Sequence, residues 1–361
     1  MRLIAGVVAL LLWCGTAAAE VAILPFEDSS GSSRAREQVA VLVAKAVRSK
    51  GWRIAGADLG PILEKERVRY VDSLDPATRG RVLDAAHASA FLSGAIYTYS
   101  DSRIPVVALS ARLVGRNGRV LWSNVVGVSA DDTEGLFGFG RKTRVDAVAA
   151  DAVARLMERF PQADAPNGTL PSGPRKPLLQ NGPITYRSPE IDATSAPVCV
   201  LPFDNLSNAP EASRIVADVL AVRLAAERDV IEPAVLRAAA LSARIGSFRG
   251  IASRDLEALS KALGTSLFLR GTVYSFATTG EARFHVEMSL VDIKSGRVLW
   301  ASQHVRKGTD YIGFLMQGNV SNAVSLTDRV VSEMIVGLEK RNEKNPVHRV
   351  DRAGRVAALR R

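Results

Sequence analysis

The sequence predicts an α/β (α+β) protein of two similar domains, each a mixed β-sheet with packed helices. Two repeated phrases carry this prediction. Gly118-Arg119-Val120-Leu121-Trp122 returns unchanged at residues 296–300, and Leu24-Pro25-Phe26 returns at residues 201–203. Matches in the same order at a nearly constant spacing indicate a repeat of domain length. The length of 361 residues also fits two domains.

Residues 1–19 are predicted to be a secretory signal peptide. Arg2 supplies the positive start, residues 3–13 are apolar, and the three alanines at 17–19 fit a cleavage site. The mature chain then begins at Glu20, and the apolar stretch is too short to span a bilayer. We therefore expect export to a bacterial periplasm, with association with the outer membrane left open.

The two cysteines decide two further points. Cys14 raises the alternative of lipid attachment, but the bulky Trp13 precedes it where a small residue is usual, so a lipoprotein is the less favoured interpretation. Cleavage after residue 19 leaves Cys199 alone, so no intrachain disulfide can form in the mature chain.

The first domain is predicted to cover residues 20–160. It begins with an apolar run at 21–26, which is typical of a strand buried on both faces. A helix follows with one apolar stripe, and a second amphipathic helix closes the domain. The first stripe is Val39, Leu42, Val43, Ala46 and Val47, and the second is Val145, Val148, Ala152, Leu156 and Phe160. Between them we expect strands at 52–55, 91–99, 106–114 and 119–128, and helices at 59–67 and 77–88.

A linker is predicted at residues 161–197, because eight of the 16 prolines lie there among Gly, Ser and Asn. The second domain, residues 198–339, repeats the order of the first. It is expected to begin with a strand at 198–203 and a helix striped by Ile215, Val219 and Val222. A helix at 255–263 follows, capped by Ser253 and ended by Gly264. An alternating strand from Phe284 to Leu290, a turn at 294–296 and a final helix with Val331, Ile335 and Leu338 complete the domain.

These motifs resemble a bacterial envelope domain found in the N-terminal part of TolB, in the secretion protein CsgG and in the penicillin-binding-protein activator LpoB. The resemblance rests on the Leu-Pro-Phe strand end, on residues 253–272 and on the Ser-Gly-Arg-Val-Leu-Trp hairpin. It implies a mixed sheet with packed helices. It does not imply one function, because the same domain serves several roles. The chain also lacks a TolB-type propeller and a clear lipidation motif.

No residue pattern predicts catalysis, a cofactor or a metal. His87, His285, His304 and His348 are scattered, without metal-ligand spacing, and His285 and His304 are interpreted as polar-face residues of strands. Residues 29–33 lie between a strand and a helix but lack the phosphate-binding glycine pattern, so a turn and helix cap is favoured there. The chain is therefore expected not to be an enzyme.

A glycine and phenylalanine loop at residues 135–141 is the predicted partner-binding site. Exposed aromatic side chains on a loop are natural anchors for a protein partner. The corresponding residues 311–316 are also apolar. The residues assigned to partner binding are Leu136, Phe137, Phe139, Arg141 and Phe314. The alternative, that these side chains fold back as core, stays open.

The C-terminal tail, residues 340–361, carries eight Lys and Arg against two acidic residues. It is either a solubilising end or a contact for anionic lipid or glycan. Its candidate contacts are Arg349, Arg352, Arg355, Arg360 and Arg361. Nucleic acid is not an expected partner of an exported chain.

Together these features predict a periplasmic, non-enzymatic scaffold or assembly factor that binds envelope proteins of a secretion, flagellar or outer-membrane structure. Two similar domains on one chain can engage two sites at a raised effective concentration. Regulation of a peptidoglycan synthase, as the LpoB resemblance allows, is the alternative. A homo-oligomer is left open.

Overall fold

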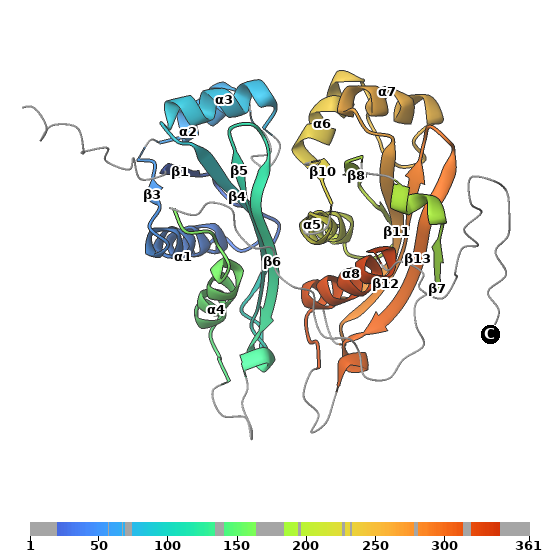
Figure 1. The fold of residues 1–361 in the computed structure, drawn as a ribbon. Coiled ribbons are helices and arrows are strands. Elements are labelled where there is room, and N and C mark those ends of the chain that lie inside the picture. The colour runs from blue at the N-terminus through green and yellow to red at the C-terminus, as the bar shows by residue number, and fades with distance from the viewer. Residues whose placement is uncertain are drawn as a thin grey trace, which may run out of the picture.

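A computed structural model shows two mixed β-sheets, each packed with helices, and so confirms the predicted fold class (Figure 1). The structure describes residues 20–56, 58–66, 68, 74–133, 141–163, 184–193, 196–225, 228–231, 233–277, 281–312 and 319–339. We call the unit from β1 to α4 the first domain and the unit from β7 to α8 the second domain. That they arose by duplication stays a prediction, as do the domain boundaries and the signal peptide.

The first sheet has the strand order β3-β1-β4-β5-β6, with the short β2 pairing with β4. The elements of the first domain are β1 (Glu20–Ile23), β2 (Glu27–Asp28), α1 (Ala35–Ser49), β3 (Arg53–Ile54), α2 (Gly60–Lys65), α3 (Pro76–Ala85), β4 (Ala90–Ser100), β5 (Val106–Gly115), β6 (Val120–Ser129), the 3₁₀ turn η2 (Ala130–Thr133) and α4 (Val145–Met157). Strand β1 lies parallel between β3 and β4, while β4, β5 and β6 are antiparallel.

The second sheet has the order β10-β8-β11-β12-β13-β7, with β9 on β11. Its elements are β7 (Ile184–Arg187), the 3₁₀ turn η4 (Pro189–Ala193), β8 (Val198–Val200), β9 (Asp204–Asn205), α5 (Ala212–Leu224), β10 (Val230–Ile231), α6 (Pro233–Ser242), α7 (Ser253–Leu263), β11 (Leu267–Ala277), β12 (Arg283–Asp292), β13 (Arg297–Lys307), the 3₁₀ turn η5 (Gly308–Tyr311) and α8 (Ala323–Glu339). Apart from β7 and η4, the two domains share one order of strands and helices.

The repeated Gly-Arg-Val-Leu-Trp phrase makes a hairpin turn and a core residue in each domain. Gly118 and Gly296 have φ of 82° and 68°, a left-handed conformation that glycine adopts without steric cost. Trp122 and Trp300 follow four residues later, and both are fully buried. Truncating such a tryptophan to alanine typically costs about 3–5 kcal/mol. The Gly-Arg-Val-Leu-Trp sequence therefore recurs because each domain needs a glycine for its hairpin turn and a tryptophan for its core.

Most of the predicted stripes are buried as expected. In α1, Val39, Val43 and Val47 are fully buried, and in β12 the residues Phe284, Val286, Met288 and Leu290 are buried in alternation with wetter neighbours. Gly264 ends α7 with φ of 67°. The Ser253 cap is wrong, because Ser253 is the first helical residue and the capping position is Ala252, which offers no side-chain acceptor.

Part of the expected linker belongs to the second sheet. Strand β7 pairs antiparallel with β13, and Ile191 in η4 is fully buried in the second core. Proline-rich composition hid this strand, because the prolines that mark a linker flank the four residues without interrupting them. Cys199 is buried and free, and burial raises its pKa to about 12.

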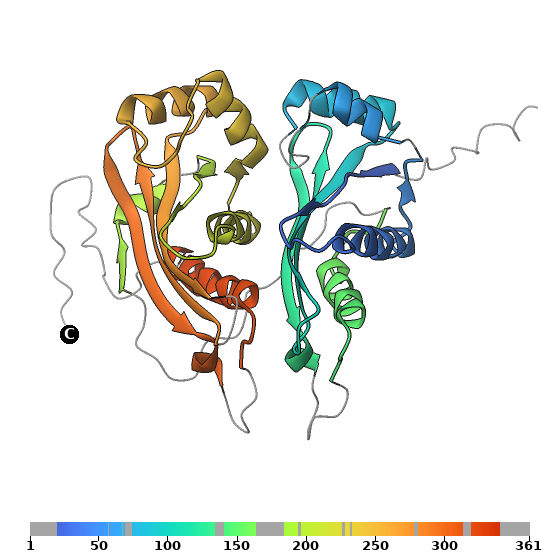
Figure 2. The ribbon, with the colours of Figure 1, turned by 180° about the vertical axis from the view of Figure 1, so that it is seen from behind.

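Each sheet has two faces with different cover. The inner face of the first sheet packs against α1 and α4, and that of the second against α5 and α8. The opposite, outer face is covered at one end by α2 and α3, or by α6 and α7 in the second domain. Figures 1 and 2 show the resulting order of layers, which is α1 and α4, first sheet, α5 and α8, second sheet.

Candidate functional site

The predicted loop residues Leu136, Phe137, Phe139 and Phe314 lie outside the described residues. So do the tail residues Arg349, Arg352, Arg355, Arg360 and Arg361. Both sets stay predictions. Arg141 is described, and its Nη2 lies 2.9 Å from Asp131 Oδ1 in η2, so it ties the far end of the loop to the turn where the loop begins.

Described residues on either side of the two loops lie at one end of the molecule. Turns η2 and η5 follow β6 and β13 directly, and both are at the lower end in Figures 1 and 2. Tyr311, which the sequence grouped with the second loop, is only 7% exposed and packs in the second core. For that residue the core alternative is correct.

The structure also shows a contact between the two domains, where the outer face of the first sheet meets α5 and α8. The outer face is built from small and apolar side chains on β4, β5 and β6, and four of them belong to the same hydrophobic cluster as α5 and α8: Ala95, Tyr97, Ala108 and Val125. Small side chains let helices approach a sheet closely. The core of the second domain therefore extends onto the outer face of the first sheet.

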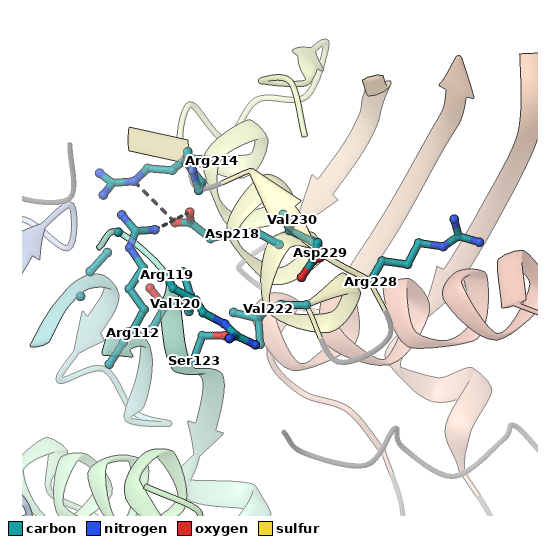
Figure 3. A pocket seen from close by; sticks show the side chains of 18 residues that line it. Arg112, Arg119, Val120, Ser123, Arg214, Asp218, Val222, Arg228, Asp229 and Val230 are labelled. Carbon is teal, nitrogen blue, oxygen red and sulfur yellow. Dashed lines mark ion pairs between the residues drawn. The ribbon is translucent and has the colours of Figure 1, made fainter. Parts of the chain in front are cut away.

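A buried ion network crosses this contact. Tyr97 donates a 2.5 Å hydrogen bond from its hydroxyl to Asp218 Oδ2 of α5, and the same hydroxyl lies 2.8 Å from Ser110 Oγ. Arg112 Nη1 from the first domain lies 4.0 Å from Asp218 Oδ1, and Arg214 Nε lies 3.8 Å from Oδ2 (Figure 3). Burial, followed by the charge of Asp218, raises the pKa of Tyr97 well above 10. Tyr97 thus stays neutral and donates to the carboxylate.

Two further contacts hold the same pair of faces together. Arg214 forms an ion pair with Glu27 at the start of β2. On α8, Ser325 Oγ donates a 2.8 Å hydrogen bond to the carbonyl of Gly127. A Cβ at Gly127 would lie 2.4 Å from Asn322 Oδ1, so any larger residue there would displace the Asn322 amide from its place between α8 and β6.

A cavity of about 160 Å³ lies in the same contact. Four arginines and two aspartates from both domains line it: Arg112, Arg119, Arg214, Arg228, Asp218 and Asp229. Figure 3 shows that Arg228 extends away from the other guanidinium groups, and Asp218 already lies between Arg112 and Arg214. The cavity is smaller than the roughly 300 Å³ or more of typical ligand pockets. Its charges serve the packing of the two domains.

The described lining residues do not form a catalytic set. The lining hydroxyls belong to Ser110, which lies within hydrogen-bond distance of Tyr97, and to Ser123, and no histidine, cysteine or lysine is among the residues described there. Across the described part of the chain, no group of three His, Cys, Asp or Glu side chains could hold a metal ion. Within that same part, no helix is long and apolar enough to cross a membrane.

His304 corrects one sequence interpretation. It was expected on a polar strand face, but it lies on the inner face of the second sheet and is 1% exposed. Burial, with a smaller contribution from Arg306, lowers its pKa to about 4. Glu333 of α8 lies 3.8 Å from its Nδ1 and accepts a 2.6 Å hydrogen bond from the Tyr311 hydroxyl. This cluster fastens η5 to α8.

The sequence analysis did not predict the contact at the outer face of the first sheet. The pattern of a strand can show that both of its faces are buried, but it does not show which element covers each face. One signal was present. Corresponding outer-face residues differ between the domains, since Ala108 and Val125 in the first correspond to His285 and Gln303 in the second. Side chains that are small and apolar in the first domain and polar in the second indicate that the face is buried in the first domain alone.

Comparison with known proteins gives matches to solved structures only. No protein-family model and no curated protein sequence matches the chain. The PelC dodecamer from Paraburkholderia phytofirmans is similar at 16% identity over 44% of this chain and 98% of PelC, with a TM-score of 0.31. Lipoprotein GNA1162 from Neisseria meningitidis matches at 18% identity over 31% of this chain and 82% of its own, with a TM-score of 0.27. The LpoB C-terminal domain from Salmonella enterica matches at 14% identity over 31% of this chain and 82% of its own, with a TM-score of 0.23.

Each of these matches covers less than half of the chain. LpoB-like and PelC-like envelope domains are therefore among its structural neighbours, at low TM-scores and over part of the chain. Scores this low carry no functional conclusion. The resemblance to TolB and CsgG stays a prediction.

Proposed function

We propose that this chain is an exported, non-enzymatic scaffold of the bacterial cell envelope that binds other envelope proteins. The observation that carries the proposal is the direct packing of the first sheet on α5 and α8. It joins the two domains through a shared core and brings the bases of both predicted loops, η2 and η5, to one end of the molecule. One partner surface can then contact both loops.

The polar groups at the domain contact support a binding role more than a catalytic one. Asp218 lies between Arg112 of the first domain and Arg214 of its own helix, so these charges of the cavity face one another. A catalytic centre would need a nucleophile, a base and an oxyanion donor around one free position. In our proposal the predicted partner-binding residues are Phe137 and Phe139, together with Leu136, Arg141 and Phe314.

A crosslinked pull-down of the chain lacking residues 1–19 tests this proposal. A variant with Phe137→Ser and Phe139→Ser should lose its envelope partners while its circular dichroism and melting temperature stay unchanged. The matched control is Leu206→Ser with Leu241→Ser, because these side chains are 55% and 72% exposed on other parts of the surface. The control should keep every partner.

Four other results have definite meanings. Retention of all partners by the folded loop variant contradicts the proposed site. Unfolding of that variant shows that the two phenylalanines are core. Specific recovery of a cell-wall synthase, with stimulation of its activity, favours the alternative of a synthase regulator. A truncation after Glu339 that loses binding to anionic vesicles would assign the tail to the membrane surface.

A further inference from the structure

The contact between the domains joins two different faces. The outer face of the first sheet packs on the exposed side of the helix pair α5 and α8. Each domain has an outer sheet face and an exposed helix face. The internal contact uses one of each, so one helix face and one sheet face are left at the two ends of the molecule. The helix pair α1 and α4 ends the stack on one side, and the outer face of the second sheet ends it on the other (Figures 1 and 2). A contact between two different faces can repeat from one molecule to the next.

The packing around two glycines shows which sheet residues correspond. A Cβ on Gly94 would meet the Phe26 ring and the backbone oxygen of Ser110, and a Cβ on Gly271 would meet the Phe203 ring and the backbone oxygen of Glu287. Glu287 therefore holds the place of Ser110. The register shifts that follow, at Ile96/Thr98 and at Val273/Ser275, put Tyr97 and Tyr274 in equivalent places.

The helices correspond in the same way. Helix α1 begins at Ala35 and α5 at Ala212, and both first residues are fully buried. Counting six residues on from each places Val41 at the position of Asp218, and counting ten places Lys45 at the position of Val222.

The unpaired sheet face carries an exposed cluster. Tyr274 is 37% exposed and stacks on His285 with ring centroids 4.6 Å apart. Its hydroxyl donates a 2.9 Å hydrogen bond to Glu287, whereas that of Tyr97 donates to α5. Tyr186 and Val305 on the neighbouring strands β7 and β13 are 55% and 59% exposed. Aromatic side chains of this kind are typical of the centre of a protein interface.

The unpaired helix face is complementary to this cluster. Val41 is 64% exposed at the middle of α1, although Asp218 at the same place in α5 meets a tyrosine. Val222 and Ser110 line one cavity in the internal contact, so their counterparts Lys45 and Glu287 would face each other with opposite charges in a contact between two molecules.

We propose that a second copy of this chain docks its α1 and α4 on the outer face of the second sheet, in the arrangement of the internal contact. Val41 covers the Tyr274–His285 stack, and Lys45 pairs with Glu287. Repetition gives a ring if the rotation closes and a filament if it does not. The contact is weaker than the internal one, because Glu37 and Asp204, both acidic, replace the internal pair Arg214 and Glu27.

Sedimentation and light scattering of the chain lacking residues 1–19, over a wide concentration range, test the proposal. The mass should rise reversibly with concentration. Glu287→Lys and Lys45→Glu should each raise the concentration needed by about tenfold or more, because like charges then meet, and the double variant should recover much of the loss. Leu241→Asp, on the exposed surface of α6, is the control and should not alter assembly. Circular dichroism and melting verify that every variant is folded.

A mixing experiment distinguishes this contact from a symmetric dimer. Lys45→Glu blocks the helix end because its carboxylate meets Glu287, and Tyr274→Glu blocks the sheet end because it removes the ring stack and places a charge against Val41. Each variant alone should stay monomeric at concentrations where the mixture forms a species of two chains that does not grow further. A single mass at all concentrations, charge-reversal variants that assemble normally, or a mixture without the two-chain species would each overturn the proposal. None of these results depends on the envelope partners proposed above.

Discussion

The two domains have the same order of strands and helices, but the outer faces of their sheets differ. In the first domain, α5 and α8 cover a part of this face that has small or apolar side chains and the buried Arg112, which faces Asp218. In the second it carries Arg270, Glu287 and His285 and is open among the described residues. Tyr97 and Tyr274 illustrate the difference, since they are 3% and 37% exposed at equivalent places. The same fold therefore accommodates a buried or an exposed outer face. The side chains on that face depend on whether another element covers it.

The inner faces differ as well, and this difference predicts the largest effect. His304 is buried on β13, whereas Val126 occupies the same place on β6. Because the pKa of His304 is lowered from 6.5 to about 4, the unfolded chain binds its proton first as the pH falls. The stability present above pH 6.5 is then lost progressively down to about pH 4, and His304 accounts for about 3 kcal/mol of that loss.

Urea unfolding between pH 8 and pH 4 checks this effect. The variant His304→Val, which inserts the residue of the first domain, should lose about 3 kcal/mol less than the native chain over the interval. The two proteins should differ little in pH dependence above pH 7. Parallel curves down to pH 4 would contradict a buried, neutral His304.

A smaller loss of stability is expected when a residue of the second domain is introduced into the first, at the contact between the domains. Gly127→Val inserts the residue that the second domain has at Val305, and its Cβ would lie 2.4 Å from Asn322 Oδ1. We expect a loss of about 2 kcal/mol from overpacking, together with a loosened contact of α8 with β6. Thermal unfolding measures the loss.

The matched change on the open face should have little effect. Val305 is 59% exposed, so Val305→Thr is expected to change stability by less than about 0.5 kcal/mol. If Gly127→Val were as mild as Val305→Thr, the first sheet would not be in close contact with α8.

The sequence predicts the elements of each domain well, because the cores depend on local apolar patterns. The stripe of Val39, Val43 and Val47 and the alternation in β12 each follow from one buried face per element. Strand β7 could not be predicted this way, because four residues in a proline-rich stretch have no periodicity of their own. They form a strand only because β13 offers a free edge.

The site was harder to predict than the fold. The aromatic loop was chosen from composition, and the residues that the structure shows in contact between the domains, such as Tyr97 and Asp218, are individually ordinary. Their partners lie more than a hundred positions away in the chain, and no local pattern encodes that distance. Comparing the two domains strand by strand contains the missing information, because Ala108 on the covered face stands where the open face carries His285.

The central claim is that the second domain covers the outer face of the first sheet, and oxidative footprinting of the native chain tests it most directly. Hydroxyl radicals modify side chains in proportion to their access to solvent, and mass spectrometry reports each tyrosine separately. Tyr274 should be modified several times faster than Tyr97, since they are 37% and 3% exposed. At a dilution where the chain is a monomer, equally fast modification of the two tyrosines would show that the domains stand apart in solution and would contradict the claim.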